Sequence, residues 1–367
     1  MKAKFRMKRI SLLFILTLLI FSCDQKENRR GAKVEASSSP RVTTPFPGES
    51  HLQNIRMLTD EGENAEAYFS FSNEFLSYQS THGQYQCDQI FTMKTDGSKK
   101  RLVSTGLGRT TCSYFLPGDK RIIYASTHGA DENCPAPPDY SKGYVWKVYS
   151  TFDLYMAAAD GSDPRPFLPA PGYDAEATVS PKSDRIVFTS QLNGDLDIYS
   201  VNIDGSDLRQ LTDELGYDGG PFYSWDGTKI VYRCYHPTAN EDVQRYRELL
   251  AAEMIEPSAF QLMVMAADGS DKRQITDNEF ANFAPFFHPD DKRIIFCSNM
   301  GSSGPGMPDF NLWVIDEDGS GLEQITFFDG FDGFPMFSRD GKRLVFASNR
   351  YNKNPRDTNI FIADWKE

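Results

Sequence analysis

Short runs of apolar and aromatic residues, each followed by a polar turn, recur along most of the chain. The turn is the tripeptide Asp-Gly-Ser, which begins at Asp96, Asp160, Asp204, Asp268 and Asp318. Asp-Gly favours a hairpin because both central positions of that turn adopt positive φ. A further strand-like segment, such as 208–213 or 272–277, follows most of these turns. Each unit is therefore predicted to contain two strands joined by an Asp-Gly turn.

A second hairpin precedes the first in each unit. In segment 180–190, Ser-Pro-Lys-Ser-Asp leads into Arg-Ile-Val-Phe-Thr-Ser. The same shape recurs at 116–126, 224–234, 288–298 and 338–348, and more weakly at 72–80. Four strands in a unit of roughly 40 to 60 residues are typical of a β-propeller blade. Six units predict an all-β fold, a six-bladed β-propeller.

The sixth unit lacks its last strand, because the chain ends three residues after the run 359–364. A matching segment stands at the other end of the domain, where 54–60 reads like 207–213. We expect this N-terminal strand to complete the last blade and close the ring. Closure removes the open sheet edge, which would otherwise favour aggregation.

The repeats resemble the WD40-like repeat of the TolB-like β-propeller family over nearly all of residues 51–367, since turn, strand and terminal Thr-Asp recur together. The resemblance implies a periplasmic scaffold that binds partners. Two features differ from TolB, which carries an α/β domain before its propeller and has no lipid anchor. The repeats also resemble the propellers of prolyl-oligopeptidase-type enzymes, but no Gly-x-Ser-x-Gly elbow follows them.

The N-terminus has the pattern of an export signal. Five basic residues between Lys2 and Arg9 precede a short apolar run, 10–21, and Leu-Ile-Phe-Ser-Cys ending at Cys23 resembles a lipobox. The expectation is a lipoprotein signal peptide at 1–22 and lipidation of Cys23, which would hold the chain on a membrane in the periplasm or at the cell surface. An ordinary secretory signal and an uncleaved anchor are the alternatives. Segment 23–50, polar and rich in Ser and Pro, is expected to be a disordered tether, with the propeller at 51–367.

Charge excludes one class of partner. The net charge is −12, and no stripe of Lys and Arg stands outside the first thirty residues. Binding to nucleic acid is not expected, because neutralising phosphates requires clustered cations. The chain is expected to be a monomer that meets the membrane only through its N-terminal lipid.

Two long insertions, 128–151 in the second unit and 235–260 in the fourth, fall in loops between second and third strands. In a propeller these loops and the links between blades lie on one face, here called the insertion face, and the Asp-Gly turns lie on the opposite turn face. Tyr144 and Trp146 are the expected ligand-binding aromatics of the first insertion. A helix capped by Asn240 is expected over 240–255 of the second. The insertions have the alternative role of plugging or bracing the propeller.

One position near the start of each innermost strand is polar in all six units. Our alignment places there Glu66, Thr110, Asp174, Asp218, Asn282 and Asp332. The four carboxylates (Glu66, Asp174, Asp218 and Asp332) are candidate ligand-binding residues, because such a ring requires a cation, a basic ligand or water among its members. Calcium is the candidate cation. The alternative is that these side chains bond nearby backbone amides.

Three of the five histidines, His82, His128 and His236, share one repeat position at the end of the second strand, where the sixth unit has Arg350. Polar ligand recognition, a metal site and a solvated turn are the competing interpretations. Among Cys87, Cys112 and Cys134, which all map to the insertion face, the expected disulfide joins Cys87 to Cys134. Cys234 and Cys297 are expected to be buried free thiols.

Two functions follow, of different classes. The first is a non-catalytic binding module for an envelope protein, peptide or glycan, with no cofactor and no catalytic residues. The alternative is a metal-dependent hydrolase or lyase, with its site at the same mouth and formed by the three histidines and the acidic ring.

Overall fold

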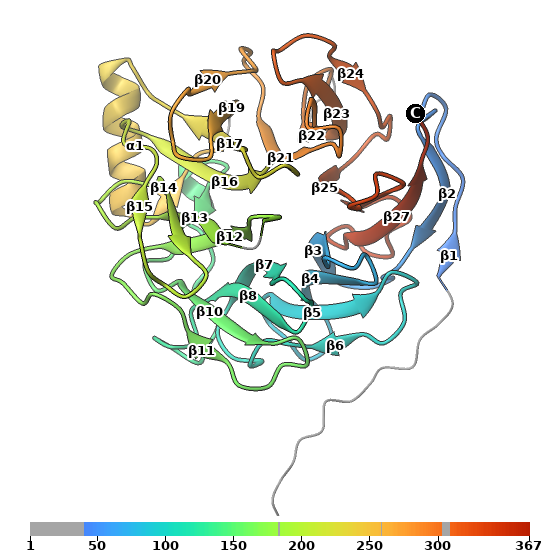
Figure 1. The fold of residues 1–367 in the computed structure, drawn as a ribbon, viewed down its shortest axis with the longest axis horizontal. Coiled ribbons are helices and arrows are strands. Elements are labelled where there is room, and N and C mark those ends of the chain that lie inside the picture. Colours follow the sequence, from blue (N-terminus) through green and yellow to red (C-terminus); the bar gives the residue numbers. More distant parts are fainter. Residues whose placement is uncertain (1–39, 183, 258, 303–308) are drawn as a thin grey trace, which may run out of the picture. The chain divides into compact units, whose positions relative to one another are not determined.

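Six antiparallel sheets, the blades, surround a central axis (Figure 1). The computed structural model describes residues 40–182, 184–257, 259–302 and 309–367. The chain is a six-bladed β-propeller, as the repeats predict. The predicted signal peptide 1–22, Cys23 and the first part of the predicted tether lie outside the described residues.

The blades are numbered from the N-terminus, and their strands run outward from the axis. Blade 1 contains β3 (Glu63–Phe69), β4 (Phe75–Thr81), β5 (Gln89–Lys94) and β6 (Arg101–Leu102). Blade 2 contains β7 (Thr110–Phe115), β8 (Arg121–Ser126), β10 (Asp153–Ala158) and β11 (Arg165–Pro166). Blade 3 contains β12 (Asp174–Val179), β13 (Arg185–Ser190), β14 (Asp197–Asn202) and β15 (Arg209–Gln210). Blade 4 contains β16 (Tyr217–Tyr223), β17 (Lys229–Tyr235), β19 (Gln261–Ala266) and β20 (Arg273–Gln274). Blade 5 contains β21 (Asn282–Phe287), β22 (Arg293–Ser298), β23 (Asn311–Asp316) and β24 (Glu323–Gln324). Blade 6 contains β25 (Asp332–Phe337), β26 (Arg343–Ser348), β27 (Asn359–Trp365), β2 (Leu52–Met57) and β1 (Arg41–Val42). The insertions add η1 (Tyr140–Lys142), β9 (Trp146–Lys147), α1 (Asn240–Ala251) and β18 (Met254–Ile255).

The second strands are buried on both faces. In β13, β22 and β26, five of six residues are buried, because the neighbouring blades cover both sides of each sheet. A strand in this position is a continuous apolar run without polar alternation, which is the pattern of Ile-Val-Phe or Leu-Val-Phe seen here.

Every innermost strand contains a β-bulge at its centre. A bulge adds one residue to one strand and turns its side chain in a new direction. The bulged residue has a positive φ in all six blades. These residues are Glu66, Cys112, Glu176, Gly220, Ala284 and Phe334.

The ring closes through the N-terminal strand, and this prediction is confirmed. β2 pairs antiparallel with β27, with Leu52 opposite Trp365 and Met57 opposite Phe361. In Figure 1 the blue β2 lies beside the dark red β27. β1 adds a fifth strand outside β2, which the repeat pattern did not indicate.

The predicted tether of 23–50 extends too far toward the C-terminus. Residues 40–50 are part of the folded domain: the ring of Phe46 lies 5.3 Å from that of Phe328, and Glu49 is only 3% exposed. The prolines and polar residues of this segment suggested a tether, whereas Phe46 and Glu49 have partners in the blade 5–6 link and in blade 6, far along the chain.

A buried ion cluster holds this segment in place. Arg350 Nη2 lies 2.9 Å from Glu49 Oε1 and 2.5 Å from Asp332 Oδ2, and all three side chains have zero exposure. Aromatic rings surround the guanidinium, with centroids 5.0 to 6.0 Å from it; they belong to Phe46, Phe328, Phe346 and Phe361. Burial raises the pKa of Asp332, against the opposing effect of Arg350. Arg350, proposed from sequence as a ligand-binding residue, is therefore enclosed and has no surface to offer a ligand.

Removing the cation from this cluster is expected to destabilise the folded state severely. Arg350→Met leaves two buried carboxylates without their partner, which should lower the free energy of unfolding by about 3–5 kcal/mol. The matched control is Arg165→Met, because the Arg165–Asp163 pair is exposed (75% and 64%) and is worth less than about 1 kcal/mol. Urea denaturation measures both. Equal stability of the two variants would show that the cluster does not hold the ring closed.

Candidate functional site

The two insertions meet on the insertion face. β9 of the first pairs antiparallel with β18 of the second, so that Trp146 lies opposite Ile255 and Lys147 opposite Met254. Lys147 Nζ also donates to Ala252 O at 3.0 Å. A disulfide between Cys87 and Cys134, the pairing expected from the sequence, ties the first insertion to the loop between β4 and β5. We call β9 and β18 together the insertion ribbon.

The helix of the second insertion is shorter than predicted. α1 ends at Ala251, its N-cap is Ala239 without a side-chain cap, and its buried residues are Tyr246 and Leu249. The pattern of 240–255 continues the helix through Met254, but Met254 and Ile255 pair instead with a strand about a hundred residues away. The Tyr246 hydroxyl donates to Gly216 O at 2.7 Å, which fixes α1 against the link between blades 3 and 4.

The two aromatics predicted to bind a ligand have different environments. Tyr144 is 53% exposed. Trp146 is half-buried: its ring centroid lies 5.7 Å from those of Phe260 and Phe283, and the Arg233 guanidinium lies 5.5 Å from it. Trp146 therefore packs against the propeller, which is the plugging role left open above, and only Tyr144 presents its ring to solvent.

The register of the strands corrects the acidic ring. The residues at the shared position pair with the end of the second strand: Thr110 with Ser126, Asp174 with Ser190, Asp218 with Cys234, Asn282 with Ser298 and Asp332 with Ser348. In blade 1 the residue opposite Ser80 is Asn64, so the alignment that placed Glu66 there was wrong by two residues.

Side chains at this position do not form a common mouth. Asp174, Asp218 and Asp332 are at most 3% exposed, and each is enclosed in its own blade. Burial raises the pKa of Asp174 to about 7. Asn282 donates to Phe260 O at 2.9 Å. The oxygen atoms expected to hold calcium together are thus enclosed separately, each in its own blade.

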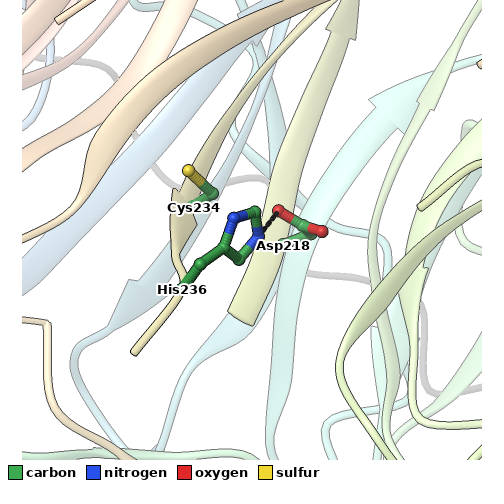
Figure 2. A group of neighbouring side chains, drawn as sticks. All are labelled: Asp218, Cys234 and His236. Carbon is green, nitrogen blue, oxygen red and sulfur yellow. Dashed lines mark hydrogen bonds and ion pairs between the residues drawn. The ribbon is translucent and has the colours of Figure 1, made fainter. Parts of the chain in front are cut away.

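The three histidines likewise bond within their own blades. His82 Nδ1 lies 2.8 Å from Ser80 Oγ, and His128 Nδ1 lies 2.7 Å from Ser126 Oγ. His236 Nε2 lies 2.9 Å from Asp218 Oδ1 (Figure 2). Each imidazole has a partner in its own blade, and the structure does not bring the three together.

The bulges build a site that the sequence did not reveal. The bulged residues, with Arg233 from β17, line a cavity of about 20 Å³ in the centre of the ring. That volume is roughly what one water molecule needs. The cavity is polar on one side, where Glu66, Cys112, Glu176 and Arg233 meet. The site depends on a bulge at the same position of each innermost strand. A bulge is not visible in a one-dimensional pattern, so the sequence carries no signal for this site.

Glu176 and Arg233 form a buried ion pair that joins blades 3 and 4. Glu176 Oε2 also accepts from Thr189 Oγ1 at 2.7 Å and from the Gly220 backbone N–H at 2.8 Å. Gly220 leaves room for the Arg233 guanidinium, because a Cβ there would stand 2.5 Å from Arg233 Nη1 and would displace it. Arg233 reaches the axis through the space that this glycine leaves.

Glu66 is the unsatisfied member of the cavity. Its Oε2 is buried without a hydrogen-bond partner. Burial, with smaller effects from Glu176 and Asp88, raises the pKa of Glu66 to about 7. Burial also raises the pKa of the Cys112 thiol, so Cys112 is protonated at neutral pH. The cavity is therefore suited to hold a proton or a water, and nothing in it is arranged as an activated nucleophile.

Comparisons with known proteins support the fold. No protein-family model matches the chain, and no protein of curated function is similar to it in sequence. Among solved structures, a TolB-type protein from Agrobacterium tumefaciens matches with a TM-score of 0.52 and 17% identity over 83% of this chain and 91% of that one. TolB from Acinetobacter baumannii gives 0.55 and 13% over 80% and 64%. Oligogalacturonate lyase from Vibrio parahaemolyticus gives 0.52 and 11% over 89% and 97%.

These similarities show a TolB-like propeller fold, which known proteins of different function share. Among the residues that the structure describes, no helix has both the length and the apolar character to cross a membrane.

The Glu66 carboxyl predicts a pH-dependent stability. Its pKa in the folded state is raised from 4.5 to about 7. The contribution of this carboxyl to the free energy of unfolding is therefore fully present below about pH 4.5 and is lost as pH rises through 7. Glu66→Gln avoids this loss. At pH 8 the variant should be more stable than the wild type by about 1–3 kcal/mol, and at pH 4.5 the two should be similar.

Urea denaturation at both pH values is the measurement, with the exposed Glu74→Gln as the control that should change neither value. A Glu66→Gln variant less stable than the wild type at pH 8 would mean that the carboxylate has a partner the geometry does not show.

Proposed function

We propose that this chain is a lipid-anchored binding module of the bacterial cell envelope, and that its insertion face docks a protein partner. The proposal combines the export signal and lipobox-like sequence at the N-terminus with the distribution of apolar side chains on the folded domain.

The distribution of exposed apolar side chains carries the proposal. The described residues include eleven large hydrophobic side chains that are exposed, and eight of them lie in the inter-blade links or in loops between second and third strands. Those eight therefore share the insertion face. They are Leu107, Tyr140, Tyr144, Leu192, Leu215, Phe280, Phe327 and Tyr351. The other three of the eleven, Val42, Leu208 and Leu322, lie elsewhere, and this unequal distribution favours the insertion face as the docking surface.

The insertion ribbon would hold two of these side chains, Tyr140 and Tyr144, on a rigid support. The disulfide from Cys87 fixes the first insertion, and Glu253 binds the Ser150 backbone N–H at 3.1 Å next to the ribbon. A preorganised surface loses less conformational entropy on binding. Tyr140 and Tyr144, at 64% and 53% exposure, combine large contact area with few rotatable bonds.

The alternative, a metal-dependent hydrolase or lyase, has less support. A lyase is among the similar folds, but at 11% identity that similarity extends to the fold alone. The catalytic residues envisaged for it, His82, His128 and His236, each bond within a separate blade. A peptide or a glycan is the other class of ligand considered for the same face. The crosslinking assay below distinguishes a protein partner from a glycan.

Lipid anchoring is tested at Cys23. Cys23→Ser removes the sulfur that would carry the diacylglycerol, so the chain should move from the detergent-extracted membrane fraction to the soluble periplasmic fraction. Fractionation and mass spectrometry of the N-terminus measure this. An unchanged membrane fraction, together with an intact N-terminus, would contradict the lipoprotein assignment.

The docking face is tested by photo-crosslinking in cells. A photoreactive residue in place of Tyr144 should give a discrete adduct with an envelope protein, and Tyr140→Ser should weaken that adduct severalfold while leaving the melting temperature within a few degrees. The matched control replaces Leu208, which is 44% exposed on the turn face and should give no adduct. Adducts at Leu208 and none at Tyr144 would move the partner to the turn face. A glycan recovered at Tyr144 without protein would replace the partner class.

A further inference from the structure

Blade 4 departs from the repeat at one buried position. The last residue of the second strand, or its equivalent in the register, is serine in five blades: Ser80, Ser126, Ser190, Ser298 and Ser348. In blade 4 it is Cys234, opposite Asp218. All six residues face the polar residue of the innermost strand.

Serine at this position connects two polar groups. Ser80 Oγ donates to Asn64 Oδ1 at 2.7 Å and lies 2.8 Å from His82 Nδ1. Ser348 Oγ lies 3.2 Å from Arg350 Nε in the same arrangement. The hydroxyl thus satisfies both its opposite neighbour and the residue two positions later in the chain.

Cysteine does not perform this task in blade 4. Asp218 is 1% exposed, and its Oδ1 accepts from His236 Nε2 at 2.9 Å. Its Oδ2 is buried without a hydrogen-bond partner. A carboxylate oxygen enclosed in this way costs stability unless a ligand takes it up.

The three side chains are neighbours, and in Figure 2 the His236 ring is directed toward the Asp218 carboxylate. One ligand atom each from Asp218, Cys234 and His236 lie within 4.8 Å of one another. The other ring nitrogen, His236 Nδ1, lies 3.2 Å from Glu214 Oε2. A carboxylate in that position fixes the tautomer of a metal-ligating imidazole and leaves Nε2 to bind the metal.

We propose that Asp218, Cys234 and His236 bind a divalent transition-metal ion of the zinc class, with Glu214 as the carboxylate behind the imidazole. Sulfur, nitrogen and oxygen ligands select zinc or cobalt, whereas calcium and magnesium prefer oxygen alone. This site shares Asp218 with the acidic ring expected from the sequence, but all three of its ligands belong to blade 4 and its loop, and it does not depend on the proposed docking function.

Binding exchanges protons for the metal. The Cys234 thiol loses its proton to solvent, and the proton shared by His236 Nε2 and Asp218 Oδ1 leaves or moves to Nδ1, next to Glu214. Metal affinity therefore increases with pH. His236 opens the second insertion, so the ion would fix the start of the segment that carries α1 to blade 4.

Cobalt titration of the full chain tests the site. After treatment with chelator and under anaerobic conditions, Co²⁺ should produce a thiolate-to-metal charge-transfer band that saturates at one equivalent, and Zn²⁺ should abolish the band. Saturating Zn²⁺ should also raise the melting temperature by a few degrees, because it binds only the folded state.

Cys234→Ser is the decisive variant, because it restores the residue that five other blades contain and should fold. It should give no band and no zinc-dependent rise in melting temperature. Cys112→Ser, which removes a different free thiol, should keep both. Glu214→Gln should keep the band with an affinity about 10–100-fold lower. The proposal is overturned if the wild type gives no band at millimolar Co²⁺, or if the band persists in Cys234→Ser.

Discussion

Closure of the ring is the constraint on which the rest of this structure depends. Each blade is covered on both faces by its neighbours, so an incomplete sixth blade would expose a sheet edge and two apolar faces. The chain solves this by beginning and ending in the same sheet, where β2 pairs with β27. Arg350 then binds Glu49 on the N-terminal side and Asp332 on β25, in a cluster without solvent contact. Two ends of the chain separated by about three hundred residues become one packed unit.

The polar position at the end of the second strand shows how one scaffold feature acquires different uses. In blades 1 and 2 a serine and a histidine bond to each other. In blade 6 the histidine is replaced by Arg350, and the same place in the repeat holds the ring closed. In blade 4 the serine is replaced by Cys234, which creates a set of metal ligands. The serine position is buried in every blade, so its replacement by Cys234 affects the interior, whereas the position two residues later is fully buried only where it holds Arg350.

Repetition made the fold predictable from the sequence. The Asp-Gly turns and the apolar runs are local signals, and five such turns with six copies of the preceding hairpin define the blades without knowledge of any long-range contact. The terminal segments could be matched to a missing strand for the same reason. The placement of three cysteines on one face narrowed the disulfide to three possible pairs, and the expected one, Cys87–Cys134, is the one present.

What the sequence could not show depends on contacts between distant segments. Glu49 lies in a polar, proline-containing stretch, and only its contact with Arg350 makes it part of the core. Met254 continues a helical pattern but pairs with Lys147 instead. Glu66 was aligned two residues out of register with the acidic ring, whereas strand pairing places it at a bulge that lines the central cavity. Arg233 comes from β17 and reaches that cavity beside Gly220, whose missing side chain leaves room for the guanidinium.

Native-state hydrogen exchange of the β2 amides tests the central role of ring closure most directly. If closure holds the propeller together, the amides of β2 that bond to β27 should open only with global unfolding, with the same free energy as those of β26, and Arg350→Met should lower both values together. Exchange of β2 as rapid as that of the exposed Asp-Gly turns, while β26 stays protected, would contradict this account. Strand β2 would then be a detachable edge on a ring that is stable without it.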